Sequence, residues 1–372
     1  MDNSLSTKEY SILLVSKDLN SQGGVVSVVS MLMNHFSIDV NCRHFRIGTT
    51  HRSHKLPINL LFPIFDCIRL VYSVLTHNFD SVCLNSSMGL KAILRDGFFL
   101  AAISFIKYKN TTVFFHGWNL HFAERIRYQK FFRKCFRRVF IKSCKIIVLA
   151  PNFKQTLIDI GIPEDKIYVT TTMFEADFFR KYKSEKYKTI PKTLLYLSRF
   201  QREKGAFETI EAVDLLRFKF PEIKLIMAGD GPERASLERL VKDRSLSKQV
   251  SFTGYVRDFE KMRVLKSAEI FVFPTYYGEG CPVSLIEAMA AGLAIITTSV
   301  GAIPDIINDG ENGILLEDIN PATIANAIKT ILSQPKQLNI IKKNNIQKAI
   351  TNYEAKKVTK NIEYIFFSKP ST

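Results

Sequence analysis

Short apolar segments alternate with longer segments of helical periodicity along most of the chain, and this alternation constrains the fold more than any other feature. Segments such as Tyr10–Val15 and Ile270–Phe273 are too short to be helices, and they lack the regular polar–apolar alternation of a half-exposed strand. They are therefore predicted to be strands of a parallel sheet that helices cover on both faces.

The same alternation runs through both halves of the chain. In the first half the expected strands are 10–15, 39–47, 80–85, 111–115, 145–150 and 166–171, and the expected helices are 25–36, 58–76, 88–107, 119–142 and 152–160. In the second half the expected strands are 193–198, 224–228, 250–252, 270–273, 294–298 and 313–316, and the expected helices are 206–219, 232–243, 258–267, 283–292 and 322–332. The segment 344–367 also has helical periodicity.

This pattern predicts an α/β protein with two Rossmann-like, doubly wound domains. We expect an N-terminal domain at 1–185 and a second domain at 186–350, with a polar, charged linker at 181–191. A C-terminal helix at 351–372 is expected to pack back onto the first domain. Ligands of such sheets bind at the carboxyl ends of the strands, so we expect the site between the facing carboxyl ends of the two sheets.

The chain of 372 residues carries a formal net charge of +17, which predicts a polyanionic partner. The segment 122–142 concentrates this charge, with eight Lys and Arg against one Glu and with Phe132, Phe136 and Phe140 at helical spacing. A basic amphipathic helix of this kind is typical of contact with an anionic membrane surface. An ordinary covering helix with a solvated basic face is the alternative. No RNA-binding module is visible, so nucleic acid is not expected as a partner.

Localisation is predicted from three negative signals. Residues 1–10 are polar and carry both charge signs, unlike a signal peptide. The longest apolar regions, 56–76 and 97–106, are interrupted or too short for a membrane-spanning helix of about 20 residues. The six cysteines have neither metal-ligand spacing nor the density of a disulfide framework, which favours buried thiols in a reducing cytosol. We therefore expect a cytoplasmic protein that is peripheral on the inner face of a membrane.

The stretch 274–292 has the features of an anion site. Gly278 and Gly280 remove bulk on either side of Glu279, and Pro282 suits the first turn of a helix that continues over 283–292. The free amides of such a turn, with the positive end of the helix dipole behind them, favour a phosphate. Glu287 leans back toward the same end of the helix. Two carboxylates beside a phosphate are expected to accept hydrogen bonds from hydroxyls attached to it, as a ribose and a sugar would offer.

Glu279 and Glu287 have the Glu-x7-Glu spacing of the retaining glycosyltransferases of family 4, and the following segment 292–316 resembles the same family. The resemblance is strong over about 194–332 and weaker over the first 180 residues. It implies the GT-B fold, with the active site in the cleft between two domains. The stretch 170–179 lacks the Asn-Gly turn of the family, so no role is carried over there.

The resemblance also implies roles for residues elsewhere. Arg199 and Lys204 match the family's Arg-x4-Lys-Gly, whose cations hold the donor diphosphate; a solvated loop with scattered charge is the alternative. His116 follows an apolar strand in a His-Gly pair and is expected to bond a sugar hydroxyl or the substrate backbone, or else to be a satisfied core residue. Gly24 lies in a loop that faces the donor phosphates in the family, although a tight turn explains it equally well.

The motifs and the resemblance together predict four catalytic residues and a set of donor-binding residues. The expected catalytic residues are His116, Arg199, Lys204 and Glu279. The expected donor-binding residues are Gly24, Arg199, Lys204, Val256, Glu279, Gly280, Cys281, Pro282, Val283 and Glu287. No metal ion and no cofactor are expected, because the chain lacks an Asp-x-Asp after a strand and its cations and helix amides can neutralise a diphosphate.

The sequence thus predicts a metal-independent, retaining hexosyltransferase of surface polysaccharide biosynthesis. It would move a hexose-type sugar from a nucleotide-diphosphate sugar to a hydroxyl of a glycan acceptor, which the basic helix suggests is lipid-linked. A non-catalytic GT-B-like protein that binds a membrane or a glycan is the alternative, and a GT-B epimerase is a third possibility. The donor base and the acceptor leave no side-chain signature in the sequence.

Overall fold

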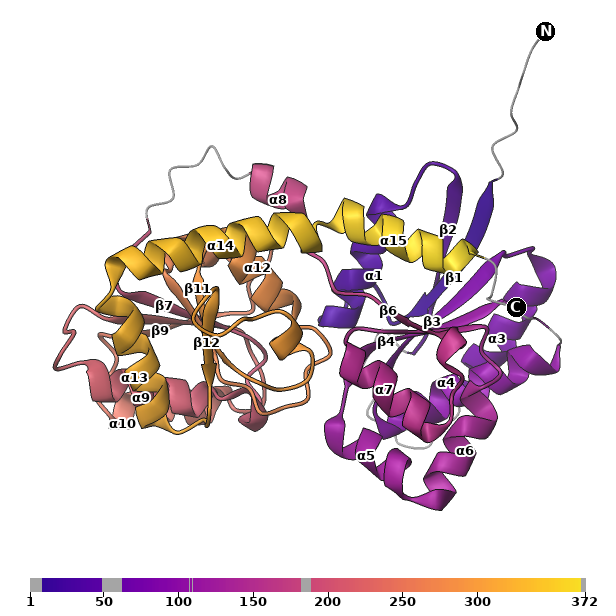
Figure 1. The fold of residues 1–372 in the computed structure, drawn as a ribbon, viewed down its shortest axis with the longest axis horizontal. Helices are drawn as coiled ribbons and strands as arrows, with labels where there is room; N and C mark the ends of the chain where they lie inside the picture. Colours follow the sequence, from indigo (N-terminus) through magenta and orange to yellow (C-terminus); the bar gives the residue numbers. More distant parts are fainter. Residues whose placement is uncertain (1–8, 49–61, 107, 109, 182–188, 369–372) are drawn as a thin grey trace, which may run out of the picture. The chain divides into compact units, whose positions relative to one another are not determined.

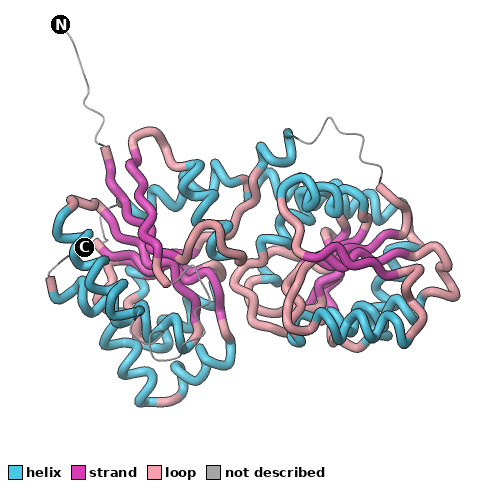
Figure 2. The backbone as a smooth tube through the Cα atoms, turned by 180° about the vertical axis from the view of Figure 1, so that it is seen from behind, coloured by secondary structure: helices cyan, strands magenta, loops and turns pink. Residues whose placement is uncertain are grey.

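The computed structural model describes residues 9–48, 62–106, 108, 110–181 and 189–368, and it divides into two compact units (Figure 1). Unit 1 comprises residues 1–172 and 355–372, and unit 2 comprises residues 173–354. The chain passes from unit 1 to unit 2 after residue 172 and returns to unit 1 after residue 354, whereas the sequence suggested boundaries at 185 and 350. Residues 182–188 of the expected linker lie outside the described part of the chain. In each unit a sheet lies between helices on both faces (Figure 2).

Unit 1 is built on a parallel sheet of six strands in the order β2-β1-β3-β4-β5-β6. Its strands are β1 (Tyr10–Ser16), β2 (Val40–Arg46), β3 (Ser81–Met88), β4 (Thr111–Trp118), β5 (Lys145–Val148) and β6 (Ile167–Val169). Its helices are α1 (Gly24–His35), α3 (Phe62–Thr76), α4 (Leu90–Phe105), α5 (Leu120–Tyr128), α6 (Lys130–Phe140), α7 (Pro151–Ile160) and α15 (Ala355–Phe367). The expected helix at 58–76 is described from residue 62 onward.

The helix expected over 119–142 is in fact two helices, so that prediction was wrong. Gln129 has φ −88° and ψ 112°, an extended conformation that ends α5 and precedes α6. The Asn119 side chain caps α5 by accepting a hydrogen bond from the amide of Phe122 at 2.9 Å. Because the chain turns at Gln129, α6 buries Phe136 and Phe140 independently of the residues that α5 buries.

The C-terminal helical segment is also interrupted, at Glu354, and its last part belongs to unit 1. In unit 1, α15 lies beside α1 (Figure 1), and the ring of Phe367 stacks on Tyr10 with centroids 4.3 Å apart. The buried ammonium group of Lys145 donates hydrogen bonds to the carbonyls of Ile365, Phe366 and Ser368 at the end of α15. A cation at this position satisfies carbonyls that the helix leaves without partners, and it fixes the end of α15 to β5.

Unit 2 contains a second parallel sheet, in the order β12-β11-β10-β7-β8-β9. Its strands are β7 (Thr193–Leu197), β8 (Lys224–Ala228), β9 (Val250–Gly254), β10 (Ile270–Phe273), β11 (Ala294–Thr298) and β12 (Gly313–Leu316). Its helices are α8 (Ala176–Lys181), α9 (Ala206–Leu216), α10 (Arg234–Asp243), α11 (Asp258–Ser267), α12 (Val283–Ala291), α13 (Pro321–Leu332) and α14 (Pro335–Tyr353).

The strand order of unit 2 determines where a ligand is expected to bind. The strand after β9 returns to the other side of β7, so the direction of winding reverses between β7 and β10. In doubly wound sheets a ligand binds at the carboxyl ends of the two strands on either side of this reversal. β7 and β10 are almost wholly buried, as expected for strands covered on both faces.

Two further observations bear on the predicted localisation. None of the helices in the described part of the chain is long and apolar enough to cross a membrane. All six cysteines are free thiols; Cys67, Cys83 and Cys281 are buried, whereas Cys135 is exposed on α6.

Candidate active site

The loops after β7 and β10 meet at the point where the strand order of unit 2 reverses. Lys204 ends a short 3-10 helix, Arg202–Lys204, after β7. Gly205 follows with φ 74°, and a Cβ atom there would lie 2.2 Å from the carbonyl oxygen of Pro274. Only glycine allows this close approach of the β7 loop to the β10 loop.

Lys204 and Glu279, which are 75 positions apart in the sequence, form an ion pair through Glu279 Oε1. Thr275 donates a hydrogen bond to the same carboxylate oxygen at 3.1 Å. The two paired side chains are only 11% and 12% exposed, so both charges lie in a poorly solvated position. Glu279 Oε2 has no hydrogen-bond partner in the described part of the chain. This second oxygen can therefore accept a hydrogen bond from a ligand hydroxyl.

The backbone of Glu279 is fixed by the loop after β11. Gly301 has φ 61°, and a Cβ atom there would lie 2.0 Å from the carbonyl oxygen of Glu279. The amide of Ala302 donates to that same carbonyl oxygen at 3.2 Å. Gly301 lies in the segment 292–316, for which the sequence predicted no individual role, and its positive φ and this close approach explain why glycine stands there.

Glu287 also pairs with a lysine, one that the sequence did not single out. Lys261 of α11 donates to Glu287 Oε1 at 2.5 Å, and the Glu287 side chain is only 11% exposed. Burial would lower the pKa of the Lys261 ammonium group, but the Glu287 carboxylate, together with Tyr255 and Asp258, outweighs burial and raises it. Like Glu279, Glu287 thus uses one carboxylate oxygen for a lysine.

The N-terminus of α12 separates the two glutamates in sequence. No side chain caps this helix, so its first amides remain available to an acceptor. Pro282 was predicted in the first turn, but with φ −68° and ψ 117° it precedes the helix as its N-cap. Gly280, Cys281 and Pro282 are buried, and Val283 is half-buried.

Arg199 follows β7 and is exposed. Its guanidinium group makes no ion pair or hydrogen bond with any residue that the structure describes. Arg199 is held in place by its backbone neighbours: the amide of Phe200 donates to Asp230 at 2.9 Å, and Gly231 passes close to Phe200. The structure therefore brings Lys204 and Glu279 into contact but leaves Arg199 unpaired, as a cation that could bind an anion.

Val256 and Gly24 have less distinctive surroundings. Val256 is buried after β9, where the carbonyl of Gly254 accepts from the amide of Gly229 at 2.8 Å. Gly24 is the exposed first residue of α1, and Gly23 before it has φ 142°. A Cβ atom at either glycine would contact nothing within 4 Å. The positive φ explains the glycine at position 23, but the structure supplies no steric reason for glycine at position 24.

His116 in unit 1 is 7% exposed and lies at an irregularity of β4. Ser86 of β3 pairs with Phe115 and Ser87 pairs with Gly117, so His116 is the extra residue of a bulge. The side-chain amide of Asn85 donates to Val15 at 3.2 Å, which directs its oxygen Oδ1 toward His116 Nε2 at 2.8 Å. Nε2 therefore carries the proton and Nδ1 is an acceptor.

His116 Nδ1 is buried and has no hydrogen-bond partner within the described residues. Burial lowers the pKa of His116 from 6.5 to about 3, so the imidazole stays neutral at physiological pH. A buried acceptor without a partner is unusual in a folded protein. Asn85, which no sequence motif singled out, thus sets the tautomer that leaves Nδ1 as an acceptor without a partner.

We expect the imidazole of His116 to remain neutral and protonated at Nε2 from pH 8 down to about pH 4, because its pKa is lowered to about 3. Nitrogen-15 NMR of histidine-labelled protein measures this directly, and the His116→Gln variant assigns the signal. In the urea-unfolded chain the same ring should titrate near 6.5. A folded-state signal that moves to the imidazolium position between pH 7 and 6 would contradict the assigned burial.

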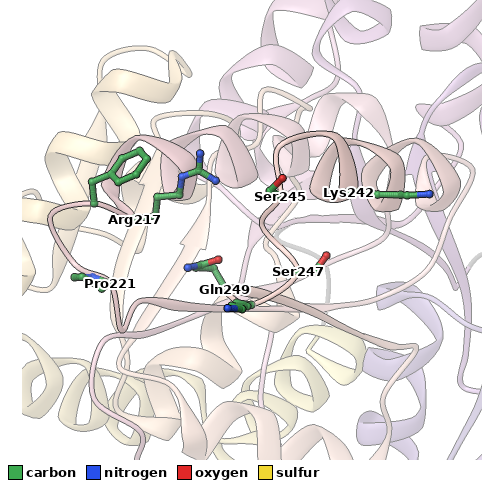
Figure 3. Close-up of a pocket in the computed structure, with 8 residues that line it drawn as sticks. Arg217, Pro221, Lys242, Ser245, Ser247 and Gln249 are labelled. Carbon is green, nitrogen blue, oxygen red and sulfur yellow. The ribbon is translucent and has the colours of Figure 1, made fainter.

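A surface hollow of about 630 Å³ lies elsewhere in unit 2 (Figure 3). It is lined by Arg217, Phe218, Pro221, Lys242, Ser245, Ser247, Lys248 and Gln249. These residues come from the ends of α9 and α10 and from the segments that precede β8 and β9. The hollow therefore lies at the amino ends of the strands, whereas Lys204 and Glu279 follow their carboxyl ends. It is not part of the predicted site.

Comparisons with known proteins match the second half of the chain to a family. Residues 177–348 match the family "Glycosyl transferases group 1". An uncharacterized glycosyltransferase of Methanocaldococcus jannaschii is 30% identical over 203 residues, which are 52% of each chain. The amylovoran biosynthesis glycosyltransferase AmsK of Erwinia amylovora is 28% identical over 63% of this chain and 58% of its own. The aligned region thus spans little more than half the length of these two relatives.

Solved structures establish the fold. The Anabaena protein HepE, crystallised in complex with UDP and glucose, superposes with a TM-score of 0.74 over 96% of this chain and 99% of its own, at 16% identity. The predicted two-domain α/β fold of the GT-B class is confirmed, with two parallel six-stranded sheets flanked by helices. At this level of identity the likeness speaks for the fold alone.

Proposed function

We propose that this protein is a retaining glycosyltransferase that moves a hexose-type sugar from a nucleotide-diphosphate sugar to a hydroxyl of a glycan acceptor. The observation that carries the proposal is the contact between Lys204 and Glu279 at the carboxyl ends of β7 and β10. The contact joins a cation and a carboxylate with one unpaired oxygen where the strand order reverses, the usual position of a ligand in such sheets. The match of residues 177–348 to group 1 glycosyl transferases supports it.

In the proposed reaction the bond from the anomeric carbon to the diphosphate oxygen breaks, and its electron pair stays on the diphosphate. The acceptor oxygen bonds to the same face of the anomeric carbon, and its proton passes to the departing phosphate. The charge that develops on the diphosphate is stabilised by Lys204, Arg199 and the amides of α12. In this scheme the reaction therefore needs no metal ion. Fixed donors of this kind contribute about 3–4 kcal/mol each.

The two glutamates bind hydroxyls in this scheme. Glu279, held by Lys204 and Thr275 through Oε1, accepts a hydrogen bond from the donor sugar at Oε2. Glu287, held by Lys261, accepts from the ribose of the nucleotide. His116 offers a neutral acceptor, Nδ1, to a substrate hydroxyl. Val256 and Gly24 are proposed to contact the donor through their backbone.

The acceptor and the location of the protein belong to the same proposal. We assign a lipid-linked glycan of surface polysaccharide biosynthesis as acceptor, at the inner face of a membrane. The relative AmsK is named for amylovoran biosynthesis, which supports a polysaccharide product. The basic surface of α5 and α6, with seven Lys and Arg against one Glu, supports an anionic membrane as the place of reaction.

Nucleoside diphosphates and their sugars provide the test. Thermal unfolding should shift upward with one of UDP, GDP or ADP, because a ligand that binds only the folded state stabilises it. Since HepE is described with UDP and glucose, UDP-sugars are the first donors to assay. The coupling constant of the anomeric proton in the product should report the same configuration as in the donor. Nucleotide binding without transfer to any acceptor would favour a non-catalytic role, and product formation without an acceptor would favour an epimerase.

A further inference from the structure

Helices α3 and α4 carry apolar side chains on their outer faces as well as on the faces that pack on the sheet. α3 buries Cys67, Leu70 and Val74. Nine exposed large apolar side chains lie on these two helices: Ile64, Phe65, Ile68, Tyr72 and Leu75 on α3, and Leu90, Leu94, Phe98 and Phe105 on α4. Ile68 and Leu94 are 62% and 66% exposed. A surface helix normally presents polar residues to water, so a second apolar stripe indicates a partner.

The stripes lie next to each other and next to a strongly basic helix. α3 packs on α4, and α4 packs on α6 (Figure 1). Gly97 of α4 faces α6, since a Cβ atom there would lie 3.4 Å from Val139, an ordinary contact distance. We call the nine exposed residues of α3 and α4 the apolar face. It adjoins α6, where Phe131 is 73% exposed.

The cations of α6 are available to a partner. Lys130, Lys134 and Arg138 are exposed, and none of them forms an ion pair with a carboxylate among the described residues. Apolar side chains next to unpaired cations are the combination that binds the headgroup region of an anionic bilayer, where the apolar residues reach the acyl chains and the cations meet the lipid charges. A second copy of this chain would bring like charges together, which is unfavourable.

We propose that the apolar face of α3 and α4 inserts into the surface of an anionic membrane, with α6 as its electrostatic flank. This deepens the membrane association proposed above, and it moves the inserted surface from the basic segment 122–142 to a pair of helices that precede it in the sequence. The proposal rests on the proposed function only for its biological setting; the binding itself involves no residue of the candidate active site.

Vesicle co-sedimentation of the full chain provides the test, with vesicles of phosphatidylcholine alone and vesicles that also contain phosphatidylglycerol. The double variant Ile68→Ser with Leu94→Ser should lower the partition coefficient about tenfold for each residue, because each loses several buried carbon atoms. The double variant Lys134→Gln with Arg138→Gln should lower it about fivefold for each charge on anionic vesicles only. About 1 M salt should remove the second effect.

The matched control is Leu215→Ser with Phe218→Ser, which removes exposed apolar side chains from unit 2, 59% and 82% exposed, and should leave vesicle binding unchanged. Any thermal shift that a nucleoside diphosphate gives in the wild type should persist in all variants, so that a failed membrane proposal is separable from a failed transfer proposal. If the Ile68→Ser, Leu94→Ser variant binds anionic vesicles as strongly as the wild type does, the inference is overturned. A wild-type dimer, seen by light scattering, that this variant abolishes would also overturn it, because the face would then be a protein interface.

Discussion

Replacing Lys204 by alanine is expected to lower the rate of sugar transfer by about 10²–10³-fold, the usual effect of removing one fixed donor from a developing oxyanion. Lys204 has two roles in the proposed reaction. It supplies positive charge beside the diphosphate, and its ion pair orients the carboxylate of Glu279. Because both roles matter most when charge develops in the transition state, kcat should fall more than the affinity for the donor.

The same variant leaves the Glu279 carboxylate without its cation in a position where the side chain is only 12% exposed. Removing one member of a buried ion pair costs stability, by about 3–5 kcal/mol in the fully buried case. Combining Lys204→Ala with Glu279→Gln removes the unpaired charge and should restore much of the lost stability, while Thr275 can still donate to the amide oxygen. The double variant should remain inactive, which separates the catalytic loss from unfolding.

Initial rates with a saturating donor, together with urea unfolding, measure both effects. Lys242→Ala is the matched control. Lys242 lines the hollow at the amino ends of the strands of the same sheet, so its loss should not affect transfer. Transfer by Lys204→Ala at the wild-type rate would remove the ion pair from the mechanism and leave the N-terminus of α12 and Arg199 as the only assigned donors to the diphosphate.

The sheets could be predicted from the sequence because their strands are short and apolar along their whole length. Ile270–Phe273 is buried at every position, so its pattern has one simple interpretation. The breaks at Gln129 and Glu354 could not be predicted, because neither residue is a glycine or proline and helical periodicity continues across both positions. Only the packing of the two shorter helices decides where the chain turns.

The candidate site was only partly predictable. Lys204 and Glu279 were each selected by resemblance, but their contact depends on β7 lying next to β10, which no local pattern encodes. Lys261 resembles the other lysines of a basic chain, and nothing in its neighbourhood marks it as the partner of Glu287. Asn85 likewise becomes meaningful only when β3 and β4 place it beside His116.

Replacing Glu287 by alanine is expected to weaken binding of the nucleoside diphosphate by about 10–100-fold, the range for hydrogen bonds to a charged group, and to abolish measurable transfer at ordinary donor concentrations. The proposed cause is the loss of an acceptor for the ribose hydroxyls. The variant also leaves Lys261 without its carboxylate, so the pKa of that ammonium group should fall from its raised value.

A comparison of ribose and deoxyribose nucleotides isolates this interaction. In the wild type, calorimetric titration should show tighter binding of the nucleoside diphosphate than of its deoxyribose analogue. Glu287→Ala should bind the two about equally, whereas Lys261→Met, which keeps the carboxylate but frees its orientation, should retain part of the preference. Glu222→Ala is the control, because Glu222 forms another Lys–Glu ion pair, with Lys192, on a more exposed surface. If Glu287→Ala keeps the full preference for ribose, the ribose is bound by other residues and Glu287 serves only to pair with Lys261.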